Sequence, residues 1–131
     1  MASLLKVDAL TGVTTAGSIS VTGEGNSTTT NLQQGLVKAW GSIDGGSTPS
    51  LDDSFNVASL TDVGTGSTRY NMVNSMANAN GSVAVANNAT SDDRGMLGLF
   101  DSSSAFRTLT RASGGSDTDR ACSAMVTGDL A

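Results

Sequence analysis

Apolar side chains alternate with polar ones over short stretches of this chain, and turn-forming residues separate the stretches. Alternation of this kind places the apolar side chains on one face of an extended strand. Short strands joined by glycine-rich turns favour an all-β fold, an antiparallel β-sandwich of jelly-roll-like type. The expected strands cover residues 3–10, 18–22, 36–43, 54–58, 68–73, 82–86, 96–100, 105–111 and 120–126.

The same alternation predicts which side chains share a face of a strand. Phe55 and Val57 are expected on one face of theirs. The pair Asn80-Gly81 predicts a hairpin turn that leads into the strand at 82–86. The side chains expected to point toward a core further along the chain are Tyr70, Met72, Cys122, Ala124 and Val126.

The first 34 residues contain too few apolar side chains to form a core of their own. We therefore expect an extended N-terminal arm over 1–34, which anchors the protein or holds a trimer together, and a β-sandwich domain over 35–131. Within the arm, 28–34 fits either one short helical turn or an extended link. The residues expected at the oligomer or anchor interface are Leu5, Val7, Ile19, Val21, Leu32 and Leu36.

Composition supports the all-β prediction and adds an expectation about assembly. Ser, Thr, Gly and Asn fill 60 of the 131 positions, and good surface-helix formers are scarce. Leu, Ile, Val and Phe together number only 26, which is a thin supply for the core of a lone subunit. We therefore expect copies of the chain to complete one another's interior in an obligate oligomer.

Charge and the length of the apolar runs each argue against one class of partner. The formal net charge is −5, whereas binding to nucleic acid requires a basic surface that displaces counterions from phosphates. No apolar run approaches the roughly 18 residues of a membrane span, so we expect no membrane insertion.

The residues that usually carry catalysis are mostly missing. The chain has no histidine, which removes Ser-His-Asp and Cys-His arrangements and His-bearing zinc sites. The single cysteine, Cys122, fits a small buried hydrophobic residue better than a reactive thiol. We expect no enzyme activity, no cofactor and no metal. The acidic clusters, which fit loop and turn roles better than catalysis or calcium binding, are Asp52-Asp53, Asp92-Asp93 and Asp117 with Asp119.

Two aromatic residues could stack on a sugar ring. Trp40 and Tyr70 each lie on an expected strand with apolar neighbours, so packing in the core is the preferred interpretation for both.

Several stretches together resemble tail-fibre-like virion structural proteins of tailed bacteriophages of the cyanophage type. The ending at 128–131 also matches, which predicts a complete chain. The segment after Gly66 departs from the aromatic-rich pattern of that family, and 88–104 matches none of it. The stretches that carry the resemblance are 5–12, 15–25, 31–40 (Asn-Leu-Gln-Gln-Gly-Leu-Val-Lys-Ala-Trp), 53–62 and the Gly-Thr-Gly turn at 64–66.

The resemblance implies a symmetric homotrimer and a place on the virion, with assembly in the host cytoplasm. The leading hypothesis is a short trimeric fibre or knob on the particle surface. Two alternatives remain open. One is a capsid decoration (cement) protein that stabilises the head; the other is an adhesin that binds host surface glycan through loops 88–104 and 113–119. The expected partners are copies of the chain itself, other virion proteins of capsid or tail, and host glycan.

Overall fold

The computed structural model describes residues 4–13, 19–22, 28–88 and 94–131. Its contacts divide the chain into two compact units, Met1–Leu36 and Val37–Ala131. The boundary lies two residues beyond the division that we expected at 34/35. Each unit is described by itself below.

Unit 1 contains little regular structure. Strand β1 (Ser20–Thr22) pairs antiparallel with β2 (Thr29–Asn31), and the short helix α1 (Leu32–Gly35) follows. The Asn31 side chain caps α1 by accepting a hydrogen bond from the Gln34 amide at 3.1 Å. The strand predicted over 3–10 is wrong for its described part, residues 4–10, which pair with no described strand. Alternation alone does not make a strand when no neighbour satisfies its backbone.

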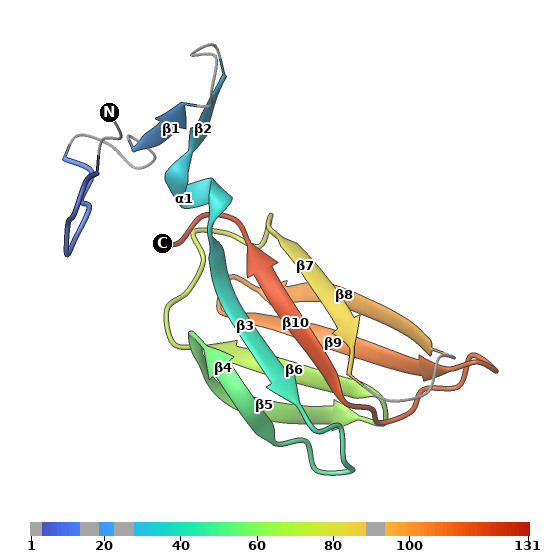
Figure 1. Ribbon diagram of the computed structural model, residues 1–131. Helices are drawn as coiled ribbons and strands as arrows, with labels where there is room; N and C mark the ends of the chain where they lie inside the picture. The colour runs from blue at the N-terminus through green and yellow to red at the C-terminus, as the bar shows by residue number, and fades with distance from the viewer. Residues whose placement is uncertain (1–3, 14–18, 23–27, 89–93) are drawn as a thin grey trace. The chain divides into compact units, whose positions relative to one another are not determined.

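Unit 2 is built from two four-stranded antiparallel sheets in a sandwich-like arrangement (Figure 1). The first has the order β4-β3-β10-β7 and the second the order β5-β6-β9-β8, which confirms the all-β antiparallel prediction. The jelly-roll connectivity is not confirmed. The strands are β3 (Val37–Ile43), β4 (Leu51–Phe55), β5 (Val57–Gly64), β6 (Ser67–Met72), β7 (Ser82–Asn87), β8 (Arg94–Ser102), β9 (Ala105–Ala112) and β10 (Cys122–Thr127).

The core lies between these two sheets. Tyr70 of β6 stacks on Phe106 of β9, with ring centroids 4.6 Å apart, and both side chains are fully buried. A Cβ added to Gly41 of β3 would lie 3.0 Å from the Tyr70 ring, so glycine there leaves room for the tyrosine. The inward orientation of Tyr70, Met72 and the alternate residues of β10 is confirmed. The buried hydrophobic cluster consists of Ala39, Ile43, Tyr70, Met72, Met76, Phe106, Cys122, Ala124 and Val126.

Two predictions about the links between strands are wrong, because the chain changes sheets where we expected it to stay. Phe55 and Val57 do not share a face: Phe55 ends β4 in the first sheet, and Val57 begins β5 in the second. Between them, Asn56 adopts a left-handed backbone with φ of 59°. The Asn80-Gly81 pair does not close a hairpin either, because β7 pairs with β10 in the first sheet whereas β6 lies in the second.

Candidate functional site

The outer face of the β4-β3-β10-β7 sheet carries a line of apolar side chains, one from each strand. Trp40 of β3 lies directly opposite Phe55 of β4 on one side and Met125 of β10 on the other. Met125 in turn pairs with Ala84 of β7. Directly paired residues of antiparallel strands share a face, with Cβ atoms about 5 Å apart. We call these four residues the outer aromatic row.

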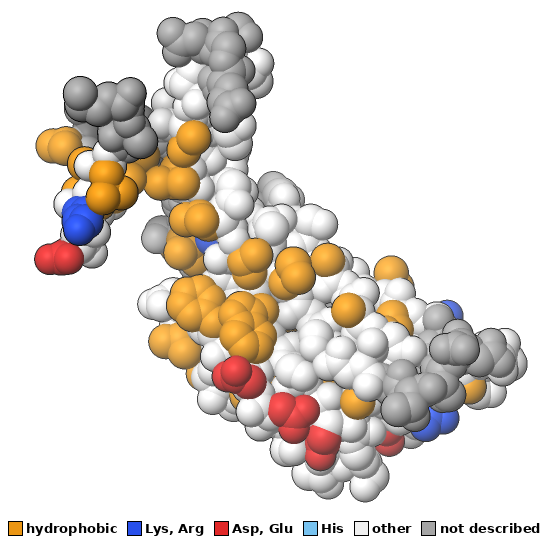
Figure 2. Space-filling view, in the orientation of Figure 1, with side chains coloured by type: hydrophobic (Ala, Val, Ile, Leu, Met, Phe, Trp, Pro, Cys, Tyr) orange, Lys and Arg blue, Asp and Glu red, His pale blue; other side chains and the backbone are white. Residues whose placement is uncertain are grey.

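The row faces away from the core. Neighbouring residues of the same strands, Ala39 and Ala124, are buried, so their chain neighbours Trp40 and Met125 point to the opposite side of the sheet. Phe55 is 55% exposed and Met125 47% exposed, while Trp40 between them is half-buried. Figure 2 shows hydrophobic side chains gathered over β3 and β4 on this face.

Placing Trp40 in the core was therefore wrong, whereas the same prediction for Tyr70 is confirmed. The signal that could have separated them lies on either side of Trp40. Ala39 and Gly41 are small, and their side of β3 is the one that accepts the Tyr70 ring from the opposite sheet. A tryptophan that alternates with small residues is therefore expected on the outer face of the strand, because the small residues leave room for the core on the inner face.

A polar row runs beside the aromatic row on the same face. Asp53 of β4 pairs with Ser42 of β3, which pairs with Ser123 of β10. The Asn88 side-chain amide donates to both serine hydroxyls, at 3.1 Å to Ser42 and 2.5 Å to Ser123. Asp53 is oriented as well, because its carboxylate accepts a hydrogen bond from the Ser54 amide at 2.8 Å. We call Asp53, Ser42, Ser123 and Asn88 the polar row.

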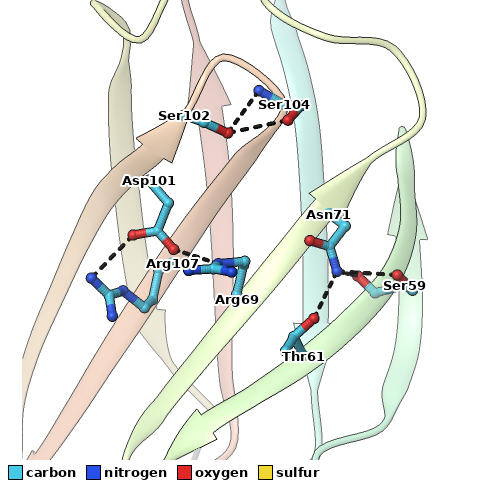
Figure 3. A network of polar contacts seen from close by, with 8 residues as sticks. All are labelled: Ser59, Thr61, Arg69, Asn71, Asp101, Ser102, Ser104 and Arg107. Atoms are coloured by element: carbon cyan, nitrogen blue, oxygen red, sulfur yellow. Dashed lines mark hydrogen bonds and ion pairs between the residues drawn. The ribbon is translucent and has the colours of Figure 1, made fainter.

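The outer face of the β5-β6-β9-β8 sheet carries a network of ion pairs (Figure 3). Asp101 sits at a register shift in β8 and accepts from two guanidinium groups, Arg69 at 2.6 Å and Arg107 at 3.0 Å. Arg69 and Arg107 are directly opposite each other on β6 and β9. Like charges in such a pair repel, and the one carboxylate between them offsets that repulsion.

The same face is extended by an amide network toward the edge strand. The Asn71 side chain donates to the hydroxyls of Ser59 at 3.1 Å and Thr61 at 3.0 Å, both on β5. Asp101 and the Asn71 amide group are therefore held by polar neighbours on the same sheet, whereas the buried Nε of Arg107 has no hydrogen-bond partner among the described residues. This network links β5, β6, β8 and β9 on one face of the sheet.

The residues predicted at an oligomer or anchor interface all lie in unit 1. Exposure is 79% for Leu5, 57% for Val7, and 53% for both Val21 and Leu36. Ile19 and Leu32 are half-buried, and the Leu32 amide donates to the Ile19 carbonyl at 2.9 Å. The structure brings only this last pair together. Their role at an interface stays a prediction.

The described acidic residues of 113–119 serve the loop itself. Asp117 pairs with Arg111 at 2.8 Å, and Asp119 accepts from the Gly66 amide at 2.6 Å. The loop role predicted for Asp52-Asp53 is wrong, because both residues belong to strand β4, and the pair Asp92-Asp93 lies outside the described residues. The predicted binding loop 88–104 contains all of β8, so most of its described part is strand. Among the described residues, no three His, Cys, Asp or Glu side chains gather as a metal site would require.

Cys122 is a free, buried thiol, as predicted. Burial raises its pKa above the ordinary value, although contacts with Tyr70 and Thr108, each at 3.7 Å, act in the opposite direction. Burial also raises the pKa of Tyr70, and the neighbouring Cys122 adds to that increase. Both groups are therefore held in the neutral form, which is the opposite of what an activated nucleophile requires.

In the described part of the chain, no helix is both long and apolar enough to cross a membrane. Comparison of the sequence and structure with models of protein families, with curated proteins and with solved structures finds no match.

Proposed function

We propose that this chain is a non-catalytic structural subunit that assembles with copies of itself into a homotrimer, as a short fibre or knob on the surface of a tailed bacteriophage. The resemblance of its sequence stretches to tail-fibre-like proteins supports the place on a virion. The surface of unit 1 supports the self-assembly.

The observation that carries the proposal is the state of the apolar side chains in unit 1. None of its described residues is buried, although five large apolar side chains between 4 and 13 are exposed. Burying one such side chain stabilises a protein by about 1.5–3 kcal/mol. A segment that leaves all of them in water gains most by packing on another chain. The five residues are Leu4, Leu5, Val7, Leu10 and Val13.

Unit 2, in contrast, has a buried cluster that draws on both of its own sheets. We therefore assign association to unit 1 and a stable displayed domain to unit 2. The two rows on the outer face of the β4-β3-β10-β7 sheet then remain available for contacts with other molecules.

Sedimentation equilibrium of the full chain tests the oligomeric state. We expect a mass of three times 13.1 kDa that persists at micromolar concentration. A folded monomer under these conditions would contradict the proposal.

Antibody labelling of virus particles that contain the chain tests its place. We expect label on the tail. Label on the head would instead support the capsid decoration alternative, in which the chain clamps neighbouring capsid subunits.

A further inference from the structure

The outer aromatic row belongs neither to the core nor to the interface proposed for unit 1, so its role is still open. It combines a half-buried tryptophan, an exposed phenylalanine and a parallel row of oriented hydrogen-bonding groups. The outer face of the opposite sheet differs, since the arginine–aspartate pairs around Asp101 lie there. The β4-β3-β10-β7 face therefore offers chemistry that the rest of unit 2 does not.

We propose that this face binds the sugar rings of an uncharged glycan, with one ring stacked on Trp40 and its hydroxyl groups directed at the polar row. The proposal concerns a ligand of unit 2 and does not rest on the trimer or on the place in a virion. It also locates the site on a sheet face and not in the loops 88–104 and 113–119.

The dimensions of the two rows fit a sugar ring. Residues two apart along a strand lie on the same face, so Trp40 and Ser42 are separated by roughly 7 Å, as are Phe55 and Asp53. A pyranose ring has an apolar face of C–H groups and a rim of hydroxyl groups. When the apolar face covers the indole of Trp40, the rim points along the strands toward Asp53 and Ser42.

The polar row is prepared for this contact. Asp53 offers a carboxylate oriented by the Ser54 amide, and carboxylates accept strong hydrogen bonds from hydroxyl groups. Ser42 and Ser123 both accept from Asn88, and a hydroxyl group that accepts one hydrogen bond can donate its own proton in another. Donors and acceptors thus stand side by side, as recognition of a polyol requires.

The width of the aromatic row argues against a protein partner. On one side it borders directly on the polar row, and on the other side the exposed Val37, which pairs with Thr127 of β10, is the next apolar side chain on this face. A stable protein interface occupies roughly 20–30 residues on each side, with an apolar centre. The four side chains of the row, together with Val37, suit one or two sugar rings and are too few for such an interface.

The surrounding charge selects among sugars. Asp52 and Asp53 are exposed on β4, and Asp44 is exposed just beyond the end of β3. Figure 2 shows carboxylates beside the hydrophobic cluster along this part of the surface. These charges repel uronic acids, sialic acids, phosphates and anionic lipid headgroups. The expected ligand is a glycan of neutral hexoses.

Fluorescence provides a direct test, because Trp40 is the only tryptophan in the chain. The full chain is titrated with three neutral polysaccharides in turn (dextran, mannan and galactan) and with alginate as an anionic comparison. We expect a saturable change in tryptophan emission with at least one neutral polysaccharide and none with alginate. Emission that changes with protein concentration alone would show that another copy covers the face, and would overturn the proposal.

Variants tested by affinity electrophoresis in polysaccharide gels complete the design. We expect Trp40→Ala to weaken binding at least tenfold, Trp40→Phe to retain part of it, and Asp53→Asn to weaken it several-fold. Leu97→Ala is the matched control, because Leu97 is 58% exposed on the other sheet and should leave binding unchanged. Two results would overturn the proposal. One is that the neutral polysaccharides slow the protein in the gel no more than alginate does, and the other is that Trp40→Ala binds as well as the unchanged chain.

Discussion

Asn56 shows how a single residue directs the path of the chain from one sheet to the other. Its side-chain amide donates to the carbonyl groups of Lys38 at 2.9 Å and Asn74 at 3.1 Å, and its oxygen accepts from the Asn74 amide at 2.7 Å. Its backbone φ of 59° lies in a region that asparagine tolerates better than most residues. Asparagine here thus supplies both the backbone conformation and the bonds that hold it.

Two substitutions at Asn56 separate these contributions. Asn56→Gly keeps the backbone conformation and loses the side-chain bonds, so we expect a loss of about 1–2 kcal/mol in the free energy of unfolding. Asn56→Ala also strains the backbone, which raises the expected loss to about 2–3 kcal/mol. Urea unfolding of both variants measures the order. An alanine variant as stable as the glycine variant would contradict the role assigned to φ.

Tyr70 and Cys122 predict a loss of stability in alkali. Both have a pKa raised in the folded state, so the unfolded chain releases their protons first. This release starts near the ordinary pKa, which is 9.0 for Cys122 and 10.0 for Tyr70. Their contribution is fully present below about pH 8 and is lost as the pH rises, by about 1.4 kcal/mol per pH unit for each group. Lys38 acts in the opposite direction, because burial lowers its pKa.

Urea unfolding between pH 7 and 11 measures this effect. The comparison with Cys122→Ala and Tyr70→Phe removes the contribution of Lys38, since all three proteins contain it. We expect each variant to lose stability less steeply above pH 9. Identical pH profiles for wild type and both variants would show that the two groups are not buried as described.

At the element scale, the Asp101 carboxylate lets β6 and β9 place two arginines opposite each other. The Asp101 side chain is only 12% exposed, so water cannot easily replace its carboxylate. In Asp101→Asn the positive charges of Arg69 and Arg107 therefore repel each other across the two strands. We expect a loss of about 1–2 kcal/mol, and the variant should be stabilised by added salt.

Asp117→Asn is the matched control for that variant, because the Asp117–Arg111 pair is about half exposed on both sides. Exposed pairs contribute about 0.2–1 kcal/mol, so the control should lose less than Asp101→Asn. Thermal unfolding at low and high salt compares them. Equal losses in the two variants would mean that the Asp101 network adds nothing beyond a surface pair.

The two faces of β7 provide a test of strand orientation. Val85 packs against the core, whereas the next residue, Ala86, is exposed on the opposite face. We expect Val85→Asp to cost about 3 kcal/mol or more and to reduce the yield of soluble protein, because a charge would be brought to the core. Ala86→Asp should stay within about 0.5 kcal/mol of wild type. Similar soluble yields and urea midpoints for both would contradict the register.

The elements were predictable because alternation is local. Eight of the expected strands overlap observed ones, and Tyr70 and the alternate residues of β10 face inward as expected. The orientation of Trp40 was not predictable from hydrophobicity alone, since it depends on where the Tyr70 ring arrives from the opposite sheet. The break at Asn56 was missed for the same reason, because its bonds to Lys38 and Asn74 each span 18 residues.

At the scale of the whole molecule, the order of the strands could not be predicted. The outer aromatic row brings together residues from β4, β3, β10 and β7, and the pair Trp40–Met125 joins positions 85 residues apart. A pattern read along the chain contains no information on such partners. The candidate site was therefore invisible until the sheet order was known, although the chemistry of its aromatic residue was recognised.

The division into two units predicts the behaviour of a truncated chain. A protein of residues 37–131 retains every member of the buried cluster, so we expect it to fold with a urea midpoint close to that of the full chain. It lacks the exposed apolar side chains of unit 1 and should sediment as a monomer. Sedimentation velocity of both proteins makes the comparison. Undiminished association of the truncated chain would move the oligomer interface to unit 2.

The position of β10 has a consequence for how the protein is made. The last strand is inserted between β3, the first strand of unit 2, and β7. During synthesis, β3 and β7 leave the ribosome before β10, the strand that pairs with both of them. Until β10 is added, the core side chains Ala39, Ile43, Val83 and Val85 have no neighbour in the position of β10. A nascent chain in that state is open to pairing with a neighbour on the same polysome. We therefore expect slow synthesis of the final residues to increase aggregation of the nascent chain.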